Sequence, residues 1–139
     1  MPLDKVFFVK IIKYFDENVD MIFHGDMIKI SEKKNFENMG NFRISYKYIP
    51  HNYSIIIDNE LRSFDISIVD AEGASNVLYR IKKYKRDLCE QNIIEALKIL
   101  KNVLEQDNFN WYFHVDNKLY RKNADGIKRI KDIREILNG

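Results

Sequence analysis

Residues 42–48 (FRISYKY) and 64–68 (FDISI) decide the fold, because apolar and polar side chains alternate in both stretches. A side-chain period of two is typical of a strand with one covered face. Residues 54–58 lie between them and contain three consecutive Ile, which predicts a third strand, covered on both faces. We therefore expect an antiparallel meander across this part of the chain.

The region before this meander shows a helical period first and then loses it. Apolar residues of 3–18 fall on about half of a helical wheel, opposite charged residues, which predicts an amphipathic helix. Residues 21–30 are interrupted at residues 24–26 (HGD) and predict either a hairpin or one bulged strand. Residues 31–41 form the most polar stretch and are expected to be a loop.

The helical period returns after the meander. Residues 74–106 keep their apolar side chains in one phase and contain no Pro or Gly after Gly73, which predicts one long helix. At about 1.5 Å per residue this helix would reach roughly 50 Å and cross the whole domain. If it breaks, Asn92 would cap a second helix.

The last part of the chain predicts three short strands and a closing helix. Alternation begins at Trp111, Asp116-Asn117 makes a turn, and Asp125-Gly126 is a strong hairpin signal. A capping-box pattern at Asp132 predicts a short helix over residues 133–138. A competing interpretation is one continuous helix from Asp125 onward.

Length and composition fit one domain over residues 1–139. The hydrophobic fraction of 45% is enough for one compact core, and a length of 139 residues is too short for two ordinary domains. Its three predicted parts are residues 1–73, 74–106 and 107–139. The expected fold class is α+β, with an N-terminal helix and a long central helix packed on a mainly antiparallel sheet, followed by a C-terminal meander and short helix.

Composition also limits the classes of function. The net charge of +2 fits neither an acidic nucleic-acid mimic nor a histone-like polycation. A single cysteine, Cys89, allows no internal disulfide, and the sequence offers no signal peptide or apolar span, so we expect a cytoplasmic protein without a membrane segment. The abundance of Ile, Lys and Asn is typical of AT-rich genes, as in low-GC bacteria and their phages.

Residue types that carry catalysis are present without a recognised arrangement. His24 with Asp26 and His114 with Asp116 are chance spacings that turn chemistry explains, and Cys89 is expected to be buried and inert on the long helix. A metal-dependent nuclease would draw its acids from Asp58, Asp65, Asp70 and Asp116. The expectation is therefore no catalytic residue, no metal and no cofactor.

Charge and aromatic residues give the better signal. Residues 1–73 have nine basic and 12 acidic side chains, a net of −3, whereas residues 74–139 have 14 and nine, a net of +5. Alternation places Tyr112 and His114 opposite Trp111, as an exposed pair. The residues expected to contact a partner are Arg80, Lys82, Lys83, Tyr84, Arg86, Tyr112, His114 and Arg121.

These observations favour a small protein-binding inhibitor, of the immunity-protein, antitoxin or phage-borne kind, that covers the functional surface of a partner protein. The alternative is a nucleic-acid-binding or regulatory module that uses the basic face of the central helix. A third interpretation is a metal-dependent nuclease that depends on Asp65 or Asp116. Sequence does not decide the oligomeric state.

Overall fold

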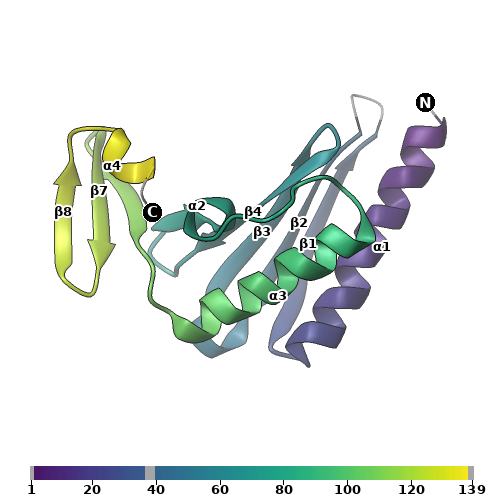
Figure 1. Cartoon of the computed structure of the whole chain (residues 1–139), viewed down its shortest axis with the longest axis horizontal. Coiled ribbons are helices and arrows are strands. Elements are labelled where there is room, and N and C mark those ends of the chain that lie inside the picture. The colour runs from purple at the N-terminus through teal and green to yellow at the C-terminus, as the bar shows by residue number, and fades with distance from the viewer. Residues whose placement is uncertain (1, 37–39, 138–139) are drawn as a thin grey trace.

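The computed structural model describes residues 2–36 and 40–137, and within them the chain forms one antiparallel sheet with four helices (Figure 1). The helices are α1 (Pro2–Phe23), α2 (Leu78–Ile81), α3 (Glu90–Gln106) and α4 (Arg134–Leu137), with a 3-10 turn, η1, at Ile49–His51. The strands are β1 (Met27–Asn35), β2 (Asn41–Tyr48), β3 (Tyr53–Glu60), β4 (Ser63–Val69), β5 (Ser75–Val77), β6 (Trp111–Val115), β7 (Lys118–Asn123) and β8 (Gly126–Ile130). Neighbours in sequence are neighbours in the sheet, from β1 to β8. The α+β class is confirmed.

Helices α1 and α3 cover one face of the first strands, and the core lies between these two layers (Figure 1). Strand β2 buries every second residue, as the alternation predicts, and its buried side chains meet Phe15 of α1 and Leu97 of α3 in one cluster. Phe15 contacts Phe64 of β4 edge to face, with ring centroids 5.4 Å apart. These buried apolar side chains supply most of the free energy that holds helices and sheet together.

Among the described residues, no helix covers the second face of the sheet over β2 to β4, and serine and charged side chains lie there together with Ile56. Ser45, Ile56 and Ser67 are directly opposite one another in the register of β2, β3 and β4. Ile56 is half-buried, whereas Ile55 and Ile57 on the helix side are fully buried. The prediction that residues 54–58 form a strand is confirmed, but the prediction that both faces are covered is wrong. We call this uncovered side the open face.

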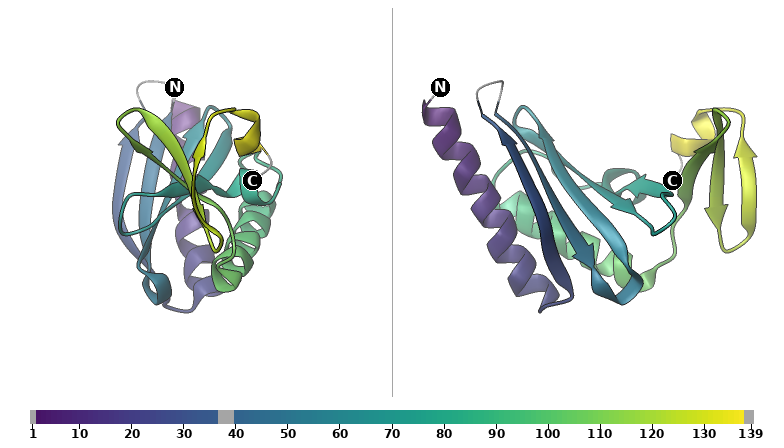
Figure 2. Two further views of the ribbon diagram at one scale, coloured as in Figure 1. Left: turned by 90° about the vertical axis from the view of Figure 1, so that its left-hand side faces the viewer. Right: turned by 180° about the vertical axis from the view of Figure 1, so that it is seen from behind.

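The C-terminal meander, β6 to β8 with α4, joins the rest of the sheet at a narrow point. The register between β5 and β6 is the single pair Ser75 and Tyr112. Beside it, Lys122 Nζ of β7 binds Asp70 Oδ2 at 2.8 Å, and Asn76 Nδ2 donates to the Asn110 carbonyl at 2.8 Å. In Figure 2 (right) the meander turns away from the first strands and lies at the opposite end of the molecule from α1, with α4 on the side that faces β5.

The region around residues 21–41 differs from its prediction. Residues 21–23 end α1, and β1 begins at Met27 after a turn in which His24 has φ 51° and Gly25 φ 93°. Of the two predicted alternatives, the hairpin is wrong and the bulged strand is confirmed from Met27 onward, with the bulge between Lys29 and Ser31. The predicted polar loop is wrong for residues 31–35, which complete β1, and residues 37–39 lie outside the described part of the chain. Strand β1 is the edge strand of the sheet, and most of its side chains are exposed to water, which fits its polar sequence.

The predicted long helix over residues 74–106 is confirmed only for residues 90–106. Residues 75–81 form β5 and α2, and residues 82–89 run extended beside the start of β4. There Phe64 N donates to the Arg86 carbonyl at 3.0 Å and Leu88 N to the Arg62 carbonyl at 2.8 Å. Leu88 is also buried, so tertiary hydrogen bonds and burial outweigh the local helical period. The helix begins after Cys89, and Asn92 does not cap it.

The three predicted C-terminal strands are confirmed, and so is the short helix over its described residues, Arg134–Leu137. Asp116 and Asn117 both have positive φ, 52° and 63°, as a tight hairpin turn requires. Asp132 Oδ1 accepts a hydrogen bond from Arg134 N at 3.0 Å. The competing single helix from Asp125 is excluded by strand β8.

Candidate functional site

The eight predicted contact residues fall into two groups in the structure. Arg80, Tyr112 and His114 line one pocket, and Arg121 is directly opposite Tyr112 in the register of β6 and β7. Lys82, Lys83, Tyr84 and Arg86 lie in the extended segment between α2 and α3, and we call residues 82–86 the cationic segment.

The first group lies where the open face meets the C-terminal meander, and we call this hollow the junction pocket. Ser75 is paired with Tyr112, so side chains of β5 and β6 at this point lie on the same face of the sheet. The pocket has a volume of about 290 Å³. It is lined by Ser67, Ser75, Asn76, Val77, Arg80, Tyr112, His114, Leu119 and Ile136. Its lining therefore combines apolar side chains, hydroxyl groups and one guanidinium, and includes no carboxylate.

Arg80 is held in the junction pocket by a buried amide. Asn76 is 2% exposed, and its Oδ1 accepts hydrogen bonds from Arg80 Nη1 at 3.0 Å and from Val77 N at 2.8 Å. The guanidinium carbon lies 5.8 Å from the centre of the Tyr112 ring. Among the described residues no carboxylate forms an ion pair with Arg80, so its charge is fixed in place and not neutralised.

Tyr112 differs from its prediction in burial. Its side chain does lie on the other face of β6 from Trp111, whose ring packs on Tyr53 with ring centroids 4.9 Å apart. However, Tyr112 is only 6% exposed. Its hydroxyl oxygen is buried and has no hydrogen-bond partner within the described part of the chain. His114 is exposed, as predicted. The prediction of an exposed pair is thus wrong for Tyr112, because it lies where β5 and β6 pair, next to Ser75 and Arg80.

In the cationic segment, the charged side chains gather on one aromatic ring. Lys83 Nζ lies 4.3 Å and Arg86 Cζ 4.1 Å from the centre of the Tyr79 ring, and Tyr84 meets the same ring edge to face at 5.5 Å. Arg86 also forms an ion pair with Asp65 at 3.3 Å. Burial and the nearby Asp65 carboxylate raise the pKa of Tyr84.

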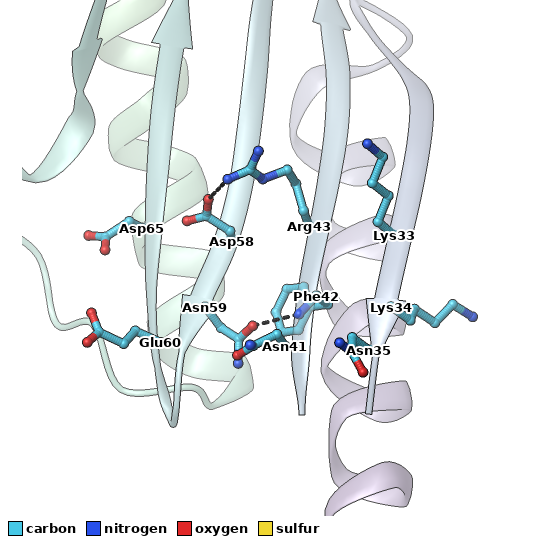
Figure 3. Close-up of a pocket in the computed structure, with 10 residues that line it drawn as sticks. All are labelled: Lys33, Lys34, Asn35, Asn41, Phe42, Arg43, Asp58, Asn59, Glu60 and Asp65. Carbon is cyan, nitrogen blue, oxygen red and sulfur yellow. Dashed lines mark hydrogen bonds and ion pairs between the residues drawn. The ribbon is translucent and has the colours of Figure 1, made fainter. Parts of the chain in front are cut away.

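The other end of the open face carries a row of charges, drawn in Figure 3. Lys33, Arg43, Asp58 and Asp65 are consecutive partners across β1 to β4. Arg43 Nη2 binds Asp58 Oδ2 at 3.0 Å, so each of the two adjacent carboxylates is neutralised by an arginine, Asp65 by Arg86. A pocket of about 490 Å³ lies over this row and carries both signs of charge.

The acids considered for metal-dependent chemistry do not converge. Asp58 and Asp65 face each other on β3 and β4, whereas Asp70 binds Lys122 and Asp116 lies in the turn after β6. Burial alone would raise the pKa of Asp70, but hydrogen bonds from Lys122 and from the Ala74 and Glu72 amides outweigh it and lower the pKa. No group of three metal-ligating side chains occurs in residues 2–36 and 40–137.

Cys89 is exposed at the N-cap of α3, so the prediction of a buried thiol is wrong. The long helix on which that prediction depended does not exist at residue 89. His24 lies in the turn after α1, and His51 approaches Asp107, with Nε2 to Oδ2 at 3.9 Å. None of these groups lines the junction pocket.

Sequence reasoning missed the residues that complete the junction pocket. The predicted helix over residues 74–106 includes Ser75 and Asn76, and its pattern gives no sign that Asn76 is a buried hydrogen-bonding residue. Leu119 and Ile136 come from β7 and α4 and meet Arg80 only through the bend of the meander. No period or spacing in the sequence links these three segments.

The chain matches no family model, no curated protein and no solved structure. Among the described helices, none combines the length and apolar character needed to cross a lipid bilayer.

Proposed function

We propose that this protein is a small cytoplasmic protein-binding inhibitor, of the immunity-protein, antitoxin or phage-borne kind, that covers a functional surface of its partner. The observation that carries the proposal is the junction pocket together with the adjacent Arg121, which we call its rim. Three of the eight predicted contact residues, Arg80, Tyr112 and His114, line the pocket, and a fourth, Arg121, is paired with Tyr112 beside it. A hollow with a fixed, uncompensated charge suits recognition of a protruding group on another protein.

The contacts that hold the site in one arrangement support the same proposal. Arg80 is fixed by Asn76, and the meander is tied to the rest of the sheet by Lys122 and Asp70. A preformed site loses little conformational entropy when it binds, so more of the contact energy appears as affinity. The charge row at residues Lys33, Arg43, Asp58 and Asp65 would add selectivity through complementary charges at the other end of the open face.

Nucleic-acid binding is the second candidate, and the cationic segment is the observation that favours it. Lys82, Lys83 and Lys85 are exposed and form no ion pair with any described residue. However, single-stranded nucleic acid is commonly bound by stacking bases on aromatic faces, and cations already lie over Tyr79. Because these cations occupy the ring on which a base would stack, the arrangement counts against nucleic-acid binding and leaves protein binding as the favoured function.

Affinity capture from the source cells tests the proposal, with two matched charge reversals. Arg121→Glu changes the face that carries the junction pocket, whereas Arg129→Glu changes the opposite face of the same meander, where Arg129 pairs with Tyr120. We expect wild type and Arg129→Glu to retain a partner protein whose activity falls on binding, and Arg121→Glu to lose it. Capture of nothing, or equal capture by both variants, would contradict the proposal.

A gel-shift titration separates the second candidate. Nucleic-acid binding predicts a salt-dependent shift that Lys82→Glu with Lys83→Glu abolishes and that Lys10→Glu with Lys13→Glu, on the exposed side of α1, leaves intact. Absence of any shift at low salt would remove this candidate.

A further inference from the structure

The junction pocket has a chemistry that can be read from its lining. Its one charged group is the Arg80 guanidinium, with His114 exposed at the margin and two serine hydroxyls, of Ser67 and Ser75, on the sheet side. The rest of the wall is apolar or aromatic, apart from the Asn76 amide, whose oxygen accepts two hydrogen bonds and whose nitrogen donates one. A ligand for this pocket therefore needs one anionic group and a small apolar part.

Arg80 still has hydrogen-bonding capacity that nothing in the described chain uses. Within residues 2–36 and 40–137, Asn76 engages Nη1 alone, which leaves the other guanidinium N–H groups able to form two parallel hydrogen bonds. Asp125 lines a separate pocket that also includes Arg80, yet it forms no ion pair with it. The buried Tyr112 hydroxyl is a second group without a partner in the described residues.

Volume and charge select the class of anion. About 290 Å³ is near the lower limit of ligand pockets and corresponds to roughly ten water molecules, so it holds a group the size of one amino-acid residue. One guanidinium matches one negative charge and the planar geometry of a carboxylate, whereas a phosphate dianion is better matched by two cations, and the lining contains one Arg and no Lys.

We infer that the junction pocket is a carboxylate-binding site in which Arg80 forms a two-pronged ion pair with a monoanionic, residue-sized ligand. In the proposed inhibitor this ligand is a carboxylate of the partner protein, so this assignment of the occupant rests on the proposed function. Two sources share this chemistry, an acidic side chain and the C-terminal carboxylate of a chain.

Titration of the full-length protein by NMR tests the site with three small probes. N-acetyl-glutamic acid α-amide carries only a side-chain carboxylate, N-acetyl-leucine only a terminal one, and N-acetyl-leucinamide none. We expect at least one carboxylate probe to shift the Arg80 Nε–H signal and the amides of residues 75–80 saturably, with a Kd of about 1 mM, and the amide probe to shift neither. The stronger carboxylate probe identifies the source.

Two variants make the result specific. Arg80→Gln keeps an amide that can donate to Asn76 but removes the charge, and it should weaken carboxylate binding at least about tenfold. Arg129→Gln removes the same charge from the opposite face of the meander and should leave binding unchanged. Spectral dispersion in the absence of probe shows whether each variant is folded.

Several outcomes would overturn the inference. They are the absence of a saturable shift with either carboxylate, an equal shift with N-acetyl-leucinamide, undiminished binding in Arg80→Gln, and tighter binding of inorganic phosphate. If capture finds a partner that Arg80→Gln still binds fully while no probe binds, the pocket assignment fails and the proposed function stands. If a carboxylate binds through Arg80 but no partner is captured, the site stands and the proposed function fails.

Discussion

Replacing Tyr112 by Phe should make the protein more stable, which is the opposite of what most substitutions of buried residues do. Tyr112 is 6% exposed and its hydroxyl oxygen is buried without a partner in the described chain. A buried polar group that makes no hydrogen bond costs about 1–3 kcal/mol. Phe keeps the ring and its packing, so the free energy of unfolding should rise by about 1–2 kcal/mol.

Urea denaturation at pH 7 measures this change. The midpoint should move to higher urea with an unchanged slope, because the surface exposed on unfolding stays the same. The melting temperature should rise by about 3–6 °C for a chain of this length. Tyr120→Phe is the matched control, since Tyr120 is half-buried on the other face of the same meander, where it stacks on Phe113, and its change should stay within about 0.5 kcal/mol.

A loss of stability in Tyr112→Phe would refute the reasoning, because it would show that the hydroxyl already has a partner in the free protein. The expected gain in stability would instead indicate that the free protein keeps the Tyr112 hydroxyl without a hydrogen bond at the junction pocket. Stability is commonly sacrificed at sites that serve binding, so the gain would strengthen the assignment of this pocket as functional.

Three further substitutions test other parts of the structure. Asp70→Asn should lower the free energy of unfolding by about 1–2 kcal/mol at pH 7, since it removes the ion pair with Lys122. The pKa of Asp70 is lower in the folded chain than in the unfolded chain. The stabilisation by Asp70 is therefore present above the unfolded pKa of about 4 and is lost as pH falls through the folded pKa. If urea denaturation gave the same difference in unfolding free energy between Asp70→Asn and wild type at pH 7 and at pH 2, this prediction would be contradicted. Cys89→Asp should raise the free energy of unfolding by about 0.5–1 kcal/mol, seen as a higher melting temperature, because Cys89 is an N-cap without a side-chain hydrogen bond. In wild type the exposed Cys89 thiol should react with a thiol reagent without denaturant. A thiol that reacts only after unfolding would show that residue 89 is buried. Gly40→Ala should cost about 3 kcal/mol in the same assay, because Gly40 has φ 67° and an added Cβ would overlap the Phe8 ring; a neutral effect would show that this turn is placed differently.

The sequence predicts the strands and helices whose local pattern agrees with their final burial. Residues 42–48 and 64–68 alternate because helices cover one of their faces, and α1 shows its apolar stripe for the same reason. The hairpin turns at Asp116 and Asp125 follow from residues that accept or favour a positive φ. These features are local, so a short window of residues contains the information.

The failures have a common cause, which is that distant contacts decide the outcome. Residues 75–89 have a helical period, yet pairing with β4 and β6 and burial of Leu88 hold them extended or in a short turn of helix. That error misplaced Cys89 and concealed Asn76. The sequence predicts Arg80 as a contact residue, but it does not predict that Arg80 lies in one pocket with Tyr112 and His114. That arrangement depends on how β6 pairs with β5, which a short window of sequence does not contain.

Hydrogen–deuterium exchange on the protein, free and bound to its captured partner, tests the central claim most directly. If the protein works by covering its partner with the junction pocket and its rim, amides of residues 75–80 and 112–121 should exchange more slowly in the complex. Slower exchange confined to the amides of α1 and α3, with unchanged rates in residues 75–80 and 112–121, would contradict the claim.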